Sequence, residues 1–96
     1  MLYHIQRPPL HKDFELPSRE ELLILKKGDL VKLIFCVEDE TPERMWVILD
    51  DCTDDIEWTG VIDNDAVGKL TTEILPAGTK VNFHPLDIIA VDFSNS

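Results

Sequence analysis

The sequence predicts a mainly β domain with one helix near its start, folded as a small SH3-like, partly open barrel or as a strongly bent antiparallel sheet. Five short segments between residues 30 and 91 have the β-branched and aromatic composition of strands, and turn residues separate them. Only one segment, residues 18–27, carries the start and stop signals of a helix. A small α+β sandwich of the ferredoxin-like kind is the alternative, and it requires a second full helix that only residues 66–75 could supply.

The chain of 96 residues is long enough for one domain with a single core. We assign residues 18–96 to that domain. Residues 1–17 are expected to form an extended N-terminal arm, because Pro8, Pro9 and Pro17 exclude a helix there. The apolar residues of the arm indicate that it packs on the domain or on a second copy.

Hydrophobic segments and cysteines indicate the compartment and the redox state of the chain. Neither a membrane span nor a signal segment is visible in it, so we expect a cytoplasmic protein. Its two cysteines, Cys36 and Cys52, are too few for a disulfide scaffold, and we expect both to be reduced thiols. The pattern is compatible with a monomer and with a homodimer.

The segment that begins at Glu43 combines an aromatic residue with β-branched residues and contains neither glycine nor proline, which predicts a strand. Alternation places Val47 on one face and Trp46 and Ile48 on the other, and both faces are largely apolar. A strand buried on both faces lies in the middle of a fold. We therefore expect Trp46 and Trp58 to be packed core residues rather than exposed anchors for a partner.

Ser18 and Glu21 have the spacing of a capping box, in which each side chain accepts a hydrogen bond from the backbone N–H of the other residue. Two lysines followed by Gly28 supply the charges and the left-handed residue that helix ends favour. The sequence therefore predicts a helix over residues 18–27. Its wide apolar face should cover one side of the sheet.

The other strands are predicted from alternating apolar residues between turns. The first should form a hairpin with the strand that begins at Glu43, because only a short turn-forming segment separates the two. Gly60 in the third strand marks a bulge or a close backbone approach. The expected strands cover residues 30–37, 43–49, 56–63, 78–83 and 88–91.

A spacing of leucine, glycine and valine occurs twice in the chain. In both copies the leucine precedes the glycine by three residues and the valine follows it by three. Because the intervening residues differ, we interpret the pattern as a recurrent turn that leads into a strand, not as a duplication. The two sets are Leu25, Gly28 and Val31, and Leu75, Gly78 and Val81.

Several short motifs occur in a fixed order along residues 25–91. They are Gly28-Asp29-x-Val31, Glu43-Arg44-Met45-Trp46-Val47, Gly60-Val61-Ile62-Asp63-Asn64, Leu75-x-x-Gly78-x-x-Val81 and Phe83-His84-Pro85-Leu86-x-Ile88-Ile89. This order resembles a group of small bacterial domains of uncharacterised function, which show a Met-Trp-Val strand, a Gly-x-Leu-x-Asn turn and a Gly-Asp-x-Val strand. In those domains a proline usually stands two residues after the asparagine, whereas Ala66 stands here. The resemblance implies a compact β domain and no known activity.

The net charge of −10 is concentrated in one part of the chain. It is 0 for residues 1–17, +1 for residues 18–37, −10 for residues 38–73 and −1 for residues 74–96. An acidic surface repels phosphate groups, so we expect neither nucleic acid nor an anionic membrane as a partner.

The acidic segment predicts instead that a protein with a basic face docks on it. We therefore interpret the chain as a non-catalytic protein-interaction module of a regulatory or immunity type. Because the segment contains two connections that flank the central strand, its charges should form two clusters at opposite ends of the sheet. The candidate partner-binding residues are Glu38, Asp39, Glu40, Glu43, Asp50, Asp51, Asp54, Asp55 and Glu57.

Patterns for catalysis and metal binding are weak. His84 with Asp87 and Cys36 could supply a base, an orienting group and a nucleophile, but none of them lies in a catalytic signature. The acidic runs lack the glycine and the terminal glutamate of a calcium loop. We therefore expect no cofactor and no metal, and we keep a small enzyme or ligand-binding domain with an unrecognised pocket as the alternative. The possible zinc ligands have no close spacing, and they are His4, His11, His84, Cys36 and Cys52.

Overall fold

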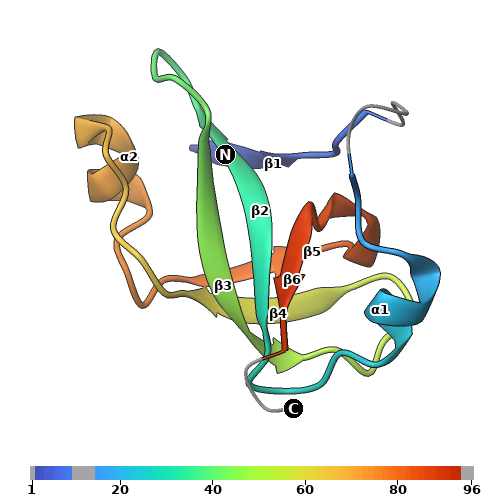
Figure 1. Cartoon of the computed structure of the whole chain (residues 1–96). Coiled ribbons are helices and arrows are strands. Elements are labelled where there is room, and N and C mark those ends of the chain that lie inside the picture. Colours follow the sequence, from blue (N-terminus) through green and yellow to red (C-terminus); the bar gives the residue numbers. More distant parts are fainter. Residues whose placement is uncertain (1, 10–14, 94–96) are drawn as a thin grey trace.

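The computed structural model describes residues 2–9 and 15–93, and it shows a six-stranded antiparallel sheet curled into a half-barrel with two short helices (Figure 1). The prediction of a mainly β, strongly bent antiparallel sheet is confirmed at this level. In chain order the elements are β1 (Tyr3–Gln6), α1 (Arg19–Leu23), β2 (Leu30–Val37), β3 (Glu43–Asp51), β4 (Trp58–Ile62), α2 (Lys69–Ile74), β5 (Lys80–Phe83), the 3-10 turn η1 (Pro85–Asp87) and β6 (Ala90–Asp92).

Strand β2 makes the most connections in the sheet. The strands pair in the order β1-β2-β3-β4-β5, and β6 also pairs with β2. The first half of β2 pairs with β6 and the second half with β1, so one edge of the strand serves two partners. The predicted hairpin of β2 and β3 is confirmed, with Val31 opposite Val47 and Leu33 opposite Met45.

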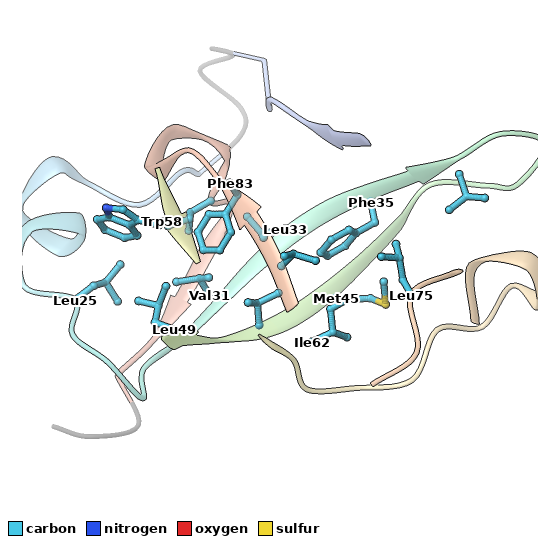
Figure 2. Packing of buried hydrophobic residues seen from close by; sticks show 14 residues of the cluster. Leu25, Val31, Leu33, Phe35, Met45, Leu49, Trp58, Ile62, Leu75 and Phe83 are labelled. Carbon is cyan, nitrogen blue, oxygen red and sulfur yellow. The ribbon is translucent and has the colours of Figure 1, made fainter. Parts of the chain in front are cut away.

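The core lies inside the curled sheet, and Figure 2 shows its packing. Alternate residues of β2 and β3 point inward, and Val31, Leu33 and Val47 are completely buried. Trp58 and Leu25 lie at one end of this core beside α1, and Leu75 lies at the other end on the side of α2 (Figure 2). The two helices therefore flank opposite ends of a single core.

The expectation that both faces of β3 are covered is wrong. The outer face carries Trp46, which is half-buried, and Ile48, which is 36% exposed. In residues 2–9 and 15–93 no second layer packs over that face, because the sheet curls around its inner side only. The ring of Trp46 is instead covered by Lys32, whose Nζ lies 5.2 Å from the ring centroid. Trp58 is a core residue as predicted, with 7% exposure.

The first helix begins as predicted and ends early. Ser18 caps it, and both hydrogen bonds of the capping box with Glu21 are present. The helix has five residues and does not continue to Lys27. Leu22 packs against the core, whereas Leu23 and Ile24 point to solvent with 72% and 65% exposure. The predicted cover of one sheet side is therefore wrong, because so short a helix turns only part of its apolar run toward the core.

Two further elements were not predicted. Residues 3–6 of the expected arm form β1, and Arg7 Nε donates to Asp87 Oδ1 at 2.9 Å. The described part of the arm therefore packs on its own chain. Residues 66–75, the segment that could have supplied a second full helix, contain α2. Its six residues are too few for the full helix of an α+β sandwich.

The repeated leucine, glycine and valine spacing forms two equivalent turns. Gly28 and Gly78 have φ angles of 96° and 94°, which favour glycine. Gly28 N–H donates to Leu49 O at 2.9 Å, and Gly78 N–H donates to Ile62 O at 2.8 Å. Each turn is therefore hydrogen-bonded to the C-terminal part of a neighbouring strand, β3 or β4. The interpretation as a recurrent turn that leads into a strand is confirmed.

Gly60 lies where the backbones of β3 and β4 come close. A Cβ atom at this position would be 2.4 Å from Val47 Cγ1 and 2.7 Å from Ile48 O. The register between the two strands shifts between Leu49 and Asp51, so the irregularity is in β3. The predicted close approach at Gly60 is confirmed, and it allows the sheet to bend sharply at this point.

Candidate functional site

The nine predicted acidic residues lie at two ends of the β2–β3–β4 meander. The β2–β3 connection carries Glu38, Asp39 and Glu40, and the start of β3 carries Glu43. The end of β3 and the β3–β4 connection carry the other five. Because β3 runs from the first group to the second, the structure separates them by the length of a nine-residue strand.

At the β2–β3 end, two of the acids bind the start of α2. Glu43 accepts hydrogen bonds from the backbone N–H groups of Val67 at 2.6 Å and Gly68 at 2.8 Å. Glu40 accepts from those of Leu70 at 2.8 Å and Thr71 at 3.3 Å. These carboxylates replace the side-chain cap that Gly68 cannot provide. Glu40 and Glu43 are therefore structural groups, and at this end Glu38 and Asp39 remain as exposed acids.

At the other end, two acids hold the β3–β4 connection in shape. Asp51 Oδ1 accepts from the backbone N–H of Thr53 at 3.0 Å and from its hydroxyl at 2.8 Å. Asp54 Oδ1 accepts from the backbone N–H groups of Ile56 at 2.8 Å and Glu57 at 3.0 Å. These bonds favour the ionised carboxylates and lower the pKa of Asp51 and of Asp54 below the ordinary value. Both residues therefore stay charged while they order the loop.

The remaining three acids of this end point outward. Asp50 lies 3.5 Å from Lys27 Nζ in an exposed ion pair. Asp55 and Glu57 are exposed, and their side chains make no described hydrogen bond within residues 2–9 and 15–93. Exposed pairs contribute little to stability, so these three carboxylates can meet a partner at little cost.

Beside this loop the surface is hollowed between α1 and the β3–β4 connection. The groove has a volume of about 290 Å³, and Leu22, Leu25 and Trp58 supply its apolar walls. Trp58 is fixed there because its indole N–H donates to Asp54 O at 2.7 Å. Arg19, Asp54 and Asp55 are the charged groups that line the groove. A second open hollow adjoins it and shares Leu25, Cys52 and Thr53.

Exposed apolar side chains occur in the groove and next to it in the chain. Leu23 lines the groove and is 72% exposed. Ile56 and Leu86 are exposed and follow the lining residues Asp55 and Pro85 in the chain, whereas Ile24 lines a separate hollow with Lys26 and Phe93. Sequence reasoning missed this feature, although four consecutive apolar residues in a short helix indicate that some of them must face solvent.

Cys52 lies in the wall of the groove but is not activated. Its thiol faces Leu25 O, with a sulfur-to-oxygen distance of 3.7 Å. Partial burial, followed by the nearby carboxylates of Asp51 and Asp29, raises the pKa of this thiol. The thiolate that nucleophilic chemistry needs is therefore disfavoured at neutral pH.

The residues weighed for catalysis make hydrogen bonds within the fold. His84 Nδ1 accepts from the backbone N–H of Leu86 at 2.9 Å, and Asp87 accepts from the backbone N–H of His84 at 3.0 Å and from Arg7. Cys36 lies in β2, where its thiol donates to Gln6 at 3.4 Å. The contacts of His84 and Asp87 cap η1, and those of Asp87 and Cys36 hold residues 6 and 7 of the arm.

The described residues form neither a metal-binding cluster nor a membrane-spanning helix. In residues 2–9 and 15–93 no group of three histidine, cysteine or acidic side chains is arranged to hold a metal ion, and His11 lies outside this part. No helix of the described residues is long and apolar enough to cross a membrane. Comparison of the chain with protein-family models, with curated proteins and with solved structures finds no match. The resemblance to small bacterial β domains therefore stays a prediction.

Proposed function

We propose that this protein is a non-catalytic interaction module of a regulatory or immunity type, and that its partner is a protein with a basic face. The observation that carries the proposal is the groove beside the β3–β4 connection. It combines apolar walls and the exposed Leu23 with the outward acid Asp55 in its lining. Glu57 follows in the same connection, and Asp50 lines the adjoining hollow. A partner segment with an apolar side chain flanked by lysine or arginine fits this combination.

The arrangement of charge supports a protein partner over a phosphate-bearing one. Within residues 38–73 the net charge is −10, and Asp54 and Asp55 of this segment line the groove. Such a surface repels nucleic acid and anionic lipid and accelerates association with a cationic protein. Glu38 and Asp39 at the far end of β3 add to the long-range field.

We infer an SH3-like barrel and a cytoplasmic location for this module. An SH3-like barrel is supported by the path of β2 to β5 and by the return of β6 to pair with β2. A cytoplasmic location is supported by Cys36 and Cys52, which are both free thiols, as is usual in reducing compartments. A bacterial source rests on the resemblance alone.

A small-ligand site is the second candidate function. The groove volume of about 290 Å³ is close to the lower end of the range for ligand pockets. Its lining contains Cys52, a thiol with a raised pKa, and Asp54, whose carboxylate accepts from loop N–H groups. The same groove therefore favours binding over catalysis.

Capture of a partner with matched baits tests the proposal. Leu23→Asp places a charge in the groove at a side chain that is 72% exposed, and Val67→Asp makes the same change at a side chain that is 94% exposed beside α2. We expect wild type and Val67→Asp to retain a common basic protein and Leu23→Asp to lose it. Equal capture by all three baits would contradict the groove, and capture of an acidic protein by the groove would contradict the proposed partner chemistry.

A further inference from the structure

The outer face of the sheet carries a compact apolar patch that the groove does not use. Leu30 in β2 stands opposite Ile48 in β3, and Ile48 stands opposite Val61 in β4. Trp46 lies in the next outward position of β3. Ile48 is 36% exposed, and the other three are half-buried. We call these four residues the outer patch.

Charges of opposite sign stand on either side of Trp46. Lys32 is its partner in β2, with Nζ 5.2 Å from the ring centroid. Asp63 follows β4 on the other side, where its backbone N–H donates to Trp46 O at 2.9 Å. Two strand spacings, about 10 Å, separate the positions of Lys32 and Asp63. A cation, an aromatic ring and an anion therefore follow one another across β2, β3 and the end of β4.

The line of residues that crosses the sheet through Leu30, Ile48 and Val61 also has charges of opposite sign at its two ends. Asp92 in β6 stands opposite Leu30 at one end of it. Lys80 in β5 stands opposite Val61 at the other end. Both charged side chains are exposed. On the strands beside β3 the face thus carries two cations and two anions around an apolar centre, although the chain as a whole has a net charge of −10. On β3 itself, Arg44 and Asp50 take the outward positions beyond the two ends of the outer patch.

We propose that the outer patch is the interface of a homodimer. In the dimer, a two-fold axis runs along β3 through Trp46 and Ile48, so the order of the charges across the sheet is reversed in the second copy. The apolar centres of the two copies then pack against each other, and Lys32 of one copy faces Asp63 of the other. A surface that becomes its own complement on rotation is what an isologous interface requires.

Charge complementarity selects a second copy over other occupants. A basic partner would meet Lys32 and Lys80, and an acidic partner would meet Asp63 and Asp92, whereas a rotated copy satisfies both pairs. The acidic ends of β3 lie outside the patch, so the net repulsion of two acidic chains is spread over the rim. Eight side chains are fewer than the roughly 20–30 residues per side of a standard interface, so we expect a weak dimer.

Sedimentation equilibrium of the full chain at fixed ionic strength tests the dimer. Wild type should shift from monomer to dimer with rising concentration, and Ile48→Lys should weaken the dimer by about tenfold or more. Val67→Lys makes the same change at an exposed side chain outside the patch and should leave the dissociation constant unchanged. Far-ultraviolet circular dichroism establishes that each variant is folded.

A charge exchange makes the test independent of the apolar substitution. Lys32→Glu and Asp63→Lys should each weaken the dimer about tenfold, because each places like charges across the axis. The double variant restores opposite charges and should recover most of the lost affinity. A wild type that stays monomeric at millimolar concentration would overturn the proposal, as would a dimer insensitive to Ile48→Lys or a double variant as weak as the single ones. Loss of the dimer leaves the groove intact, so the proposed partner is tested separately.

Discussion

Removal of the carboxylate groups of Glu40 and Glu43 should detach the start of α2 from the tip of the β2–β3 hairpin. Each carboxylate accepts two backbone hydrogen bonds from the start of a six-residue helix. The loss of a helix cap costs about 0.5–2 kcal/mol, and partial exposure places each site near about 1 kcal/mol. The double alanine variant should therefore lose about 2 kcal/mol out of the roughly 5–14 kcal/mol expected for a domain of 96 residues.

Urea denaturation followed by tryptophan fluorescence measures this loss, and thermal unfolding should show a decrease of about 8–16 °C in Tm for the double variant. Glu43→Gln keeps one acceptor oxygen and should lose less than Glu43→Ala. The matched control is Glu38→Ala, because Glu38 is exposed and lies in the same connection. If the double variant were as stable as this control, the carboxylate cap would not hold α2 in solution.

Three further changes test separate contacts. Gly60→Ala should cost about 2 kcal/mol or more in urea denaturation, because its Cβ would lie 2.4 Å from Val47 Cγ1, and a neutral result would show that the two strands can separate. Ser18→Ala should destabilise by about 1 kcal/mol and Ser18→Asp by almost nothing, and equal losses would remove the capping box as the cause. In a Cys36→Ser background, the alkylation rate of Cys52 should reach half its plateau at a higher pH than that of a cysteine peptide, whereas an equal or lower midpoint would contradict the effect of burial on its pKa.

Much of the sheet could be predicted because local patterns determine it. Apolar side chains occupy every second position from Val31 to Val37, and β2 has the predicted bounds of residues 30–37. The capping box at Ser18 and the two glycine turns are also encoded within a few residues of sequence. Strand β1 was missed because it is only four residues long and is followed by two prolines, which dominate the local pattern.

The remaining differences depend on contacts between distant residues. Trp46 has the pattern of a core residue, but the curl of the sheet leaves its face outward and Lys32 covers the ring. Glu40 and Glu43 have the pattern of a solvated acidic run, but α2, 24 to 31 residues away, uses them as a cap. The groove joins α1 to the β3–β4 connection, so no local motif could reveal it.

The central claim is that the outward acids beside the groove attract a basic partner. Asp51 and Asp54 hold the loop, so the informative variant is Asp55→Asn with Glu57→Gln, which removes two charges and no described side-chain hydrogen bond in residues 2–9 and 15–93. Glu38→Gln with Asp39→Asn removes the same charge at the far end of β3 and is the control.

The direct measurement is the association rate with the captured partner by stopped flow at rising salt concentration. The rate should fall steeply with salt, and it should decrease by about threefold or more in the Asp55 and Glu57 variant and little in the control. A rate that is unchanged by salt and by both variants would contradict the claim.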